Sequence, residues 1–272
     1  MSFEAEITSL KNDRVKDVVR LRTKRERDRQ GLTIIEEPLV IGRALDAGYP
    51  FRTLFYCPEQ VTDEGLLSRL GDVAGLEPVL VSEPVMDKIS YRENGAGLLV
   101  VAPQVTAGLD DLDLPADALV VVLENVEKPG NLGAILRTAD GAGAHAVLLC
   151  GGGTDLFNPN VLRASRGAFF SVPTTSAETA TILDFCRDRG LKTVATSPDA
   201  PGSWVDADLS GGTAILLGAE DTGLTPELMA AADVSVALPM AGAGDSLNVS
   251  TTAAIMLYEA VRQRQAARKD DR

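Results

Sequence analysis

Near its C-terminal end the chain reads Gly244-Asp245-Ser246-Leu247-Asn248-Val249-Ser250, and an apolar segment with helical spacing follows at once. Far upstream it reads Asn131-Leu132-Gly133-Ala134-Ile135-Leu136-Arg137-Thr138, and Leu216-Leu217-Gly218-Ala219-Glu220-Asp221-Thr222-Gly223 lies between the two. Each stretch follows a continuous run of Val, Leu, Ile or Ala. Such runs are typical of parallel strands buried on both faces. Because parallel sheets bind ligands beyond the carboxyl ends of their strands, the three stretches predict one site at one sheet edge.

Apolar runs elsewhere extend this α/β pattern over the whole chain. In the second half, strands are expected at residues 118–123, 146–150, 191–196, 213–217 and 234–238, with helices between most of them and at 249–261. In the first half, strands are expected at 33–36, 52–57, 78–81 and 97–102, and helices at 11–30, 39–47, 64–73 and 84–91. Residues 104–117 carry Gly, Pro and Asp without periodicity. We therefore predict a small α/β domain at 1–103, a linker at 104–117 and a larger, mostly parallel-sheet α/β domain at 118–272.

Composition excludes several classes of protein. No apolar run is long enough to cross a membrane, and the charged first thirty residues do not resemble a signal peptide. A soluble, cytoplasmic protein is expected. Cys57, Cys150 and Cys186 are odd in number and far apart, which favours reduced, buried thiols over disulfides or a metal site. The single histidine, His145, removes most metal and Ser-His-Asp sites, and a structural or exposed role is expected for it.

Charge is unevenly distributed. The net charge is −13, yet nine basic residues stand against four acidic ones between Lys11 and Arg29. Lys and Arg supply phosphate contacts, so this segment is the candidate nucleic-acid-binding surface. The candidate residues are Lys11, Arg14, Lys16, Arg20, Arg22, Lys24 and Arg25. The alternative is a solvated helix whose opposite charges pair along its surface.

The first polar stretch contains two candidate functional residues. Asn131 opens the predicted helix, where its commonest role is an N-cap. Arg137 lies off the apolar face, on a face of small residues that leaves its guanidinium projecting. An ion pair with Asp140 is the structural alternative.

The other two stretches each admit a structural alternative. Gly218 and its neighbours fit either a tight turn or close approach of a cofactor, and Glu220 could pair with a base or face solvent. Either Ser246 or Asn248 should cap the following helix. The loop before them could hold an adenine edge or be an ordinary connection. Gly151-Gly152-Gly153 is no dinucleotide fingerprint, because Leu156 stands where its third glycine belongs.

The three stretches in this order resemble the SpoU (TrmH-type) family of RNA ribose 2'-O-methyltransferases, in the SPOUT superfamily, over most of residues 118–264. The resemblance implies S-adenosylmethionine bound in a deep trefoil knot and an active site at a homodimer interface. Sequence physics alone would never propose a knot. Ile7 to Asn12 with Arg14-Val15-Lys16 resembles the start of the family's ribosomal-protein-like RNA-binding domain. Glu37 departs from many relatives, which have glycine there, and puts RNA contacts at that turn in doubt.

The same resemblance assigns roles to individual residues. Arg137 would be the catalytic arginine, with Asn131, Glu220, Ser246 and Asn248 as its polar companions. The cofactor-contacting positions would be Thr196, Gly218, Leu238, Met240 and Leu247. An arginine is normally too basic to deprotonate a hydroxyl. Whether Arg137 acts as a base or orients phosphate and 2'-hydroxyl stays open at this point.

We therefore predict an S-adenosylmethionine-dependent ribose 2'-O-methyltransferase acting on RNA, with 23S ribosomal RNA favoured and no metal. Its modification could be housekeeping or confer antibiotic resistance. The alternatives are a tRNA enzyme and a non-catalytic RNA-binding or ribosome-assembly protein. An oxidoreductase lacks its fingerprint. A homodimer is expected from the resemblance and from a broad apolar face on the last helix, made by Val249, Ala253, Met256, Leu257, Ala260 and Val261.

Overall fold

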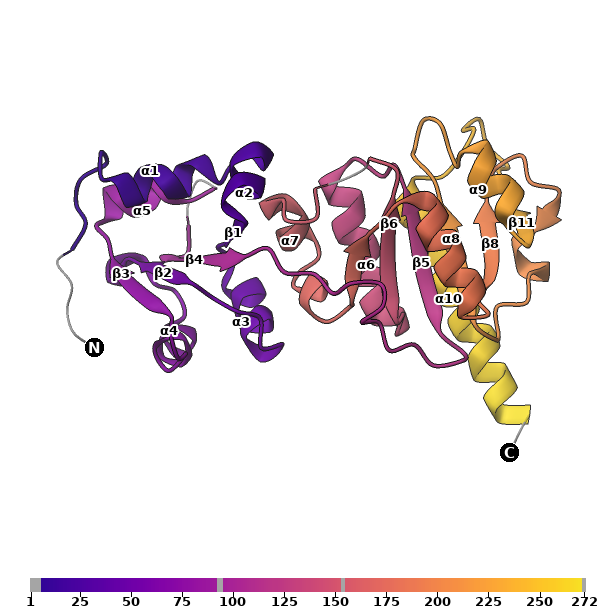
Figure 1. Cartoon of the computed structure of the whole chain (residues 1–272), viewed down its shortest axis with the longest axis horizontal. Coiled ribbons are helices and arrows are strands. Elements are labelled where there is room, and N and C mark those ends of the chain that lie inside the picture. Colours follow the sequence, from indigo (N-terminus) through magenta and orange to yellow (C-terminus); the bar gives the residue numbers. More distant parts are fainter. Residues whose placement is uncertain (1–5, 92–94, 153–154, 271–272) are drawn as a thin grey trace. The chain divides into compact units, whose positions relative to one another are not determined.

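The computed structural model describes residues 6–91, 95–152 and 155–270. The chain divides into two compact units (Figure 1). The first contains residues 1–105 together with 155–170, and the second contains residues 106–154 and 171–272. Residues 155–170 follow the first strands of the second unit along the chain but pack with the first. Residues 106–117 belong to the second unit, where the buried side chain of Leu112 joins its core.

The first unit is a four-stranded sheet, over the described residues, between two layers of helices (Figure 1). Its order is β1 (Leu32–Ile35), β4 (Leu98–Pro103), β2 (Thr53–Tyr56), β3 (Glu77–Leu80). Only the β2–β3 pair is parallel. Apolar residues of α1 (Asp13–Arg20) and α5 (Glu83–Ile89) cover one face. The remaining elements of this unit are α2 (Lys24–Gln30), α3 (Pro38–Asp46), η1 (Pro58–Gln60), α4 (Glu64–Gly71), α7 (Pro159–Ala164) and η2 (Ala168–Phe170).

The single helix predicted over residues 11–30 is wrong, because the structure has two helices there. Asn12 caps α1 by accepting from the Arg14 N–H at 2.9 Å, and Thr23 is extended (φ −99°, ψ 140°) just before α2. The break leaves the Leu21 carbonyl outside regular helix, and Arg27 Nη1 donates to it at 2.8 Å. Gly31 ends α2 in the left-handed region at φ +63°, as its place in the sequence predicted.

The second unit is built on a mostly parallel sheet, which confirms the predicted α/β class. Over the described residues it has seven strands in the order β7-β6-β5-β10-β8-β11-β9, and neighbouring strands pair in parallel throughout. The strands are β5 (Leu119–Glu124), β6 (Ala146–Cys150), β7 (Thr174–Ser176), β8 (Lys192–Thr196), β9 (Gly202–Ser203), β10 (Thr213–Leu217) and β11 (Val234–Ala237). The short strands β7 and β9 were not predicted. The helical elements are α6 (Pro129–Ala142), α8 (Thr179–Asp188), η3 (Trp204–Asp206), α9 (Pro226–Ala231) and α10 (Val249–Asp270).

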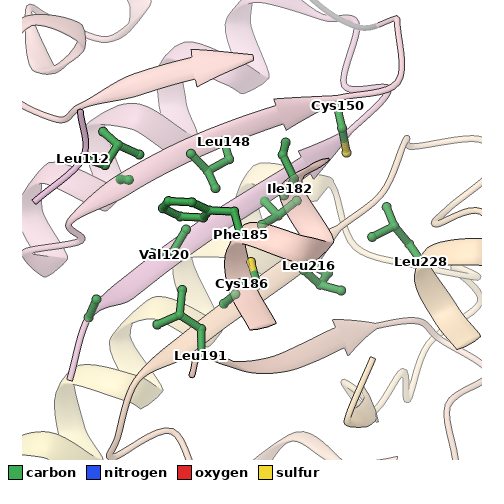
Figure 2. Packing of buried hydrophobic residues seen from close by; sticks show 14 of the residues in the cluster. Leu112, Val120, Leu148, Cys150, Ile182, Phe185, Cys186, Leu191, Leu216 and Leu228 are labelled. Atoms are coloured by element: carbon green, nitrogen blue, oxygen red, sulfur yellow. The ribbon is translucent and has the colours of Figure 1, made fainter. Parts of the chain in front are cut away.

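One core layer of the second unit lies between α8 and a face of the sheet. Figure 2 shows Ile182, Phe185 and Cys186 of α8 facing buried side chains of the central strands, among them Val120, Leu148 and Leu216. On α10, Val249, Ala253, Met256, Leu257 and Ala260 are buried within the chain, where α10 packs against α6 and β10. The apolar face proposed for dimerisation is therefore largely used inside the single chain.

The lone histidine has a structural contact, as expected. His145 Nδ1 accepts a hydrogen bond from the Leu119 backbone N–H at 3.1 Å, which joins the connection between α6 and β6 to the start of β5. Gly151 turns the chain after β6 with φ +76°, and Gly153 lies outside the described residues. Within the described ranges, no helix is both long and apolar enough to cross a bilayer, and no cluster of His, Cys, Asp and Glu could hold a metal ion.

The three cysteines are free and buried, as predicted. Burial raises the pKa of each thiol to about 11, so only roughly one thiol in a thousand is ionised at pH 8. We expect no fast reaction with a disulfide reagent at pH 8 in the native protein and three equivalents after unfolding in guanidinium. The measurement is thiol titration by absorbance. Rapid labelling of even one equivalent in the native state would contradict this assignment.

Candidate functional site

The second unit has a cavity of about 460 Å³ beyond the carboxyl ends of β8, β10 and β11. Three loops form its walls: residues 196–199 after β8, residues 217–224 after β10, and residues 238–247 after β11, from which Leu238, Met240, Asp245, Ser246 and Leu247 contribute. Val249 and Thr252 of α10 and Met229 of α9 complete it. The five residues predicted to contact cofactor all line this one cavity, together with Glu220 and Ser246. They are Thr196, Gly218, Leu238, Met240 and Leu247.

The glycines after β10 form a tight turn. The backbone groups of Ala219 and Gly223 bond reciprocally, at 3.1 Å and 2.9 Å, and Gly223 has φ +68°. A Cβ added to Gly218 would collide with the backbone of Gly223 and Leu224. Thr196 Oγ1 donates to the Leu216 carbonyl at 3.1 Å, which ties the end of β8 to β10. The turn is thus held in one shape at the edge of the cavity.

The Gly218→Ala substitution should disrupt this turn, because neither collision is with a flexible side chain. We expect S-adenosylmethionine affinity, measured by calorimetry, to fall by about tenfold or more, since misplaced polar groups lose binding energy quickly. The matched control is Gly211→Ala, where an added Cβ meets open space at ordinary φ. Equal affinity of the Gly218 variant and wild type would show that the turn does not shape the cavity.

Glu220 is held by an ion pair with Lys128, just before α6. Its side chain is 25% exposed, whereas that of Lys128 is 70% exposed. Of the two roles left open by sequence, pairing with a base is the one observed. Lys128 was not singled out from sequence, because ninety-two positions separate it from Glu220.

A second carboxylate beside the cavity was also missed. Glu124 ends β5 with only 2% exposure, and it accepts from both the backbone N–H and the hydroxyl of Thr225, at 2.7 Å and 2.8 Å. Thr225 in turn accepts from the Leu228 N–H at 3.4 Å, which confirms it as the N-cap of α9. Because Thr225 follows Leu224 of the cavity wall, Glu124 anchors that wall to the central strand. A carboxylate ending a buried apolar strand was the available sequence signal.

Asn131 and Asn248 meet in the structure. Asn248 Nδ2 donates to Asn131 Oδ1 at 3.3 Å. Asn248 also caps α10, where its Oδ1 accepts from the N–H and the hydroxyl of Ser250 at 2.9 Å and 2.6 Å, so the predicted cap is Asn248. The N-cap role considered for Asn131 is wrong, because α6 begins at Pro129 and Lys128 occupies the cap position. Asn131 Nδ2 is buried and has no hydrogen-bond partner among the described residues.

Arg137 lies on the exposed side of α6, as predicted. The alternative ion pair with Asp140 does not form within residues 6–91, 95–152 and 155–270, and Asp140 instead accepts from the Ser171 hydroxyl at 2.6 Å. Arg137 is six residues beyond Asn131, about 9 Å along the helix axis. It is not among the residues that line the cavity.

The basic segment of the first unit is largely neutralised by its own surface. Arg14 pairs with Glu77, and Lys16, Arg20 and Lys24 pair with acids on their own helices. Arg22 donates to the carbonyls of Lys88 and Ser90. In the described part of the chain only Lys11 and Arg25, of the seven candidates, lack a side-chain partner. Lys16, Arg20 and Lys24 thus have the pairing expected of a solvated helix, and Arg14 is neutralised by a carboxylate of β3.

The cavity lies where parallel strands end, and its walls contain a glycine turn and apolar side chains. This arrangement defines a cofactor-binding α/β domain. Residues 118–258 match the SpoU rRNA Methylase family, and residues 12–100 match the MRM3-like substrate binding domain. The chain therefore belongs to the SpoU rRNA methylase family, which confirms the resemblance seen in the sequence.

Known proteins align over nearly the whole chain. It is 30% identical over 254 residues to the 23S rRNA (uridine(2479)-2'-O)-methyltransferase of Streptomyces viridochromogenes, which covers 91% of this chain and 88% of that protein. It is 41% identical to an RNA 2'-O ribose methyltransferase of known structure, with a TM-score of 0.83 and coverages of 96% and 100%. An AdoMet-bound rRNA methyltransferase from Sinorhizobium meliloti is 34% identical, with a TM-score of 0.87 and coverages of 95% and 97%.

Proposed function

We propose that this protein transfers a methyl group from S-adenosylmethionine to a ribose 2'-hydroxyl of ribosomal RNA, with 23S rRNA as the substrate. The observation that carries the proposal is the single cavity beyond β8, β10 and β11, where all five predicted cofactor positions meet Glu220 and Ser246. Family membership supplies the reaction class. In the proposed division of labour, the first unit (residues 1–105 and 155–170) binds RNA, and the second unit (residues 106–154 and 171–272) holds cofactor and chemistry.

The cavity fits the cofactor in size and charge. Its volume of about 460 Å³ falls in the range of small-molecule sites. Leu217, Leu238, Met240 and Leu247 supply apolar walls for an adenine ring. Its lining includes four acidic residues, Asp199, Glu220, Asp221 and Asp245. Among the described residues that line it there is no Lys or Arg. An acidic lining favours S-adenosylmethionine, whose sulfonium and ammonium give it a net positive charge. When bound, this group supplies the electrophilic methyl.

The chain's own residues then position the RNA. Arg137 orients a phosphate and the 2'-hydroxyl, because its planar fork donates to two oxygens together and is too basic to accept a proton at neutral pH. Asn131 Nδ2 is a buried donor without a partner in the described structure, at the start of the helix that carries Arg137. Asn248 fixes Asn131 from the cap of α10. Lys128 holds Glu220, and Ser246 lines the cavity beside it.

The proposal includes a homodimer and the trefoil knot that the resemblance implies for the C-terminal strands and helix. Support for a second copy comes from Arg137, which a single chain does not place in the lining of the cavity. Met240, Leu247 and Tyr258 are exposed large side chains of the same unit, at 36%, 37% and 53%. They offer dimer surface in place of the buried face of α10. Light scattering at micromolar concentration should give twice the chain mass, and a fully active monomer would exclude the dimer.

The function is tested by mapping and by transfer. Ribose methylation of RNA from cells with and without the gene should differ at one 23S nucleotide, and purified protein should restore labelled methyl to that RNA. Transfer to tRNA instead would replace the substrate assignment. Cofactor and RNA binding without transfer would favour the non-catalytic alternative. Comparing drug susceptibility of the two strains tests the resistance role.

Removing residues 1–103 is a poor test of the division of labour. Residues 155–170 pack with the first unit, so truncation would strip this segment of its partners and expose Phe157 and Phe169, whose rings pack edge to face with centroids 5.5 Å apart. Lost RNA methylation could then reflect misfolding. Point substitutions of Lys11 and Arg25 in the full chain are cleaner, because neither side chain has a partner among the described residues. Unchanged methylation with Lys11→Gln and Arg25→Gln would place the RNA contacts elsewhere.

A further inference from the structure

Three arginines of the first unit lie outside the sequence-predicted basic segment and form no ion pair within the described structure. They are Arg43 of α3, Arg163 of α7 and Arg166 just after α7. The predicted segment differs, because most of its cations are neutralised by neighbouring carboxylates. Three neighbouring arginines without an ion pair are unexpected in a chain of net charge −13, because its carboxylates outnumber its cations.

These arginines are gathered by the way residues 155–170 pack onto the first unit. Asp155 pairs with the buried Arg27, and the Thr33 hydroxyl donates to the Phe157 carbonyl at 2.8 Å. Asn160 Nδ2 donates to the Tyr91 hydroxyl at 3.0 Å. These contacts hold residues 155–160, which lead into α7, against the first unit. The position of the α7 C-terminus is therefore set by the fold of the first unit.

The turn after α7 is rigid and presents Arg166 to solvent. The buried Ser165 hydroxyl donates to the Leu162 carbonyl at 2.7 Å and accepts from the Gly167 and Phe169 N–H groups at 3.2 Å and 3.4 Å. Arg43 Nη1 donates to the Arg166 carbonyl at 2.9 Å, and a Cβ on Gly167 would collide with the Arg43 side chain. Arg43 and Arg166 are thus immediate neighbours, with Arg163 one helical turn away.

Arg166 also occupies an unfavourable backbone conformation. Its φ is +52°, in the left-handed region where Gly and Asn are the usual residues. Among residues 6–91, 95–152 and 155–270, no carboxylate pairs with this exposed side chain. A residue kept at such a position despite its conformational cost points to a role for the side chain itself.

We infer that Arg43, Arg163 and Arg166 form an RNA phosphate-binding surface, called here the α7 arginine surface. Guanidinium groups bind phosphate oxygens through paired donors. Among the nearby acids, Asp46 of α3 pairs with Arg69, while Glu36 accepts from the Tyr91 N–H. Glu36 and Glu37 line a small hollow with Arg163, and neither forms an ion pair with the three arginines in the described part of the chain. The inference rests on the proposed function for its choice of RNA over an acidic protein.

The test uses the full-length chain with Arg163→Gln and Arg166→Asn together. Arg43 is left unchanged because its guanidinium also holds the turn. The control, Arg187→Gln with Arg189→Gln, removes the same charge from the end of α8. The probe is 23S rRNA transcribed in vitro, titrated from 0.05 to 0.3 M KCl. Cofactor affinity by calorimetry and melting temperature are measured on each variant.

We expect RNA affinity of the α7 variant to fall by about tenfold at 0.1 M salt. The magnitude of its salt slope should fall by about 1.4 to 1.8, since each of the two lost phosphate contacts removes about 0.7 to 0.9. The RNA affinity of the control should stay within about twofold of wild type, because neither of its substituted arginines belongs to a proposed phosphate contact. S-adenosylmethionine affinity should not change. Because Asn tolerates the left-handed region, the Arg166→Asn substitution should not lower the melting temperature.

Two results would overturn the surface: wild-type RNA affinity and slope in the α7 variant, or equal loss in both double variants, which would indicate general charge. Unchanged binding of 23S rRNA by the α7 variant, together with loss of binding to an acidic polypeptide that wild type and the control variant both bind, would reassign the surface to a protein partner. Failure of the wild-type chain to bind or methylate 23S rRNA would instead refute the proposed function. The two failures are therefore distinguishable.

Discussion

Arg137→Ala should abolish methyl transfer, by about 10³-fold or more, while leaving cofactor affinity and stability close to wild type. The size follows from the loss of donors aimed at the reacting group, which costs about 10² to 10³ in rate for one donor, and a guanidinium provides more than one. Stability should hold because Arg137 is exposed and has no partner among the described residues. The measurement is single-turnover transfer of labelled methyl to 23S rRNA, beside calorimetric titration of S-adenosylmethionine.

Lysine at position 137 should not restore turnover, because it keeps the charge but loses the planar fork. Arg187→Ala is the matched control, an exposed arginine whose partner is Asp184 on its own helix. It should lose at most about 1 kcal/mol of stability and no activity. Wild-type turnover in the Arg137→Ala variant would falsify the catalytic assignment. Parallel loss of cofactor binding would make Arg137 part of the cofactor site instead.

The largest effect on stability should come from Arg27→Ala, at about 3 to 5 kcal/mol in the unfolding of the first unit. Arg27 is 1% exposed, it pairs with Asp155, and it donates to the Leu21 carbonyl. Removing one member of a buried ion pair leaves the other charge desolvated without compensation. Because the chain has two compact units, unfolding should be followed with a probe in the first unit as well as by overall circular dichroism.

Two further variants separate charge burial from simple loss of volume. The double variant Arg27→Met with Asp155→Leu should recover most of the lost stability, since a buried pair is often replaceable by apolar residues. Lys24→Ala, which breaks the exposed pair with Asp28, should cost at most about 1 kcal/mol. If Arg27→Ala cost no more than Lys24→Ala, the pair with Asp155 would not hold residues 155–170 on the first unit.

The central strands of the second unit could be predicted from local patterns in the sequence. The predicted strands at 146–150 and 213–217 coincide with β6 and β10. Continuous apolar runs are a direct consequence of burial on both sheet faces, so sequence alone reports them. Caps were equally accessible, because Thr225 and Asn248 satisfy donors within their own helix termini. The three polar stretches identified the family, and parallel topology then placed the ends of three strands around one cavity.

Tertiary contacts decided which distant groups meet. Glu124 binds Thr225 across 101 positions, Arg27 meets Asp155 across 128, and Arg43 reaches the Arg166 carbonyl across 123. No local period encodes such pairs, because they depend on the order of strands and on which unit a segment joins. Long-range packing also buried the apolar face of α10 against α6 and β10 and took residues 155–170 into the first unit. The sequence by itself determined the longer strands, the caps at Thr225 and Asn248, and the family, since these reflect local spacing. Only long-range packing determined which charges are neutralised and which arginines stay free for a ligand.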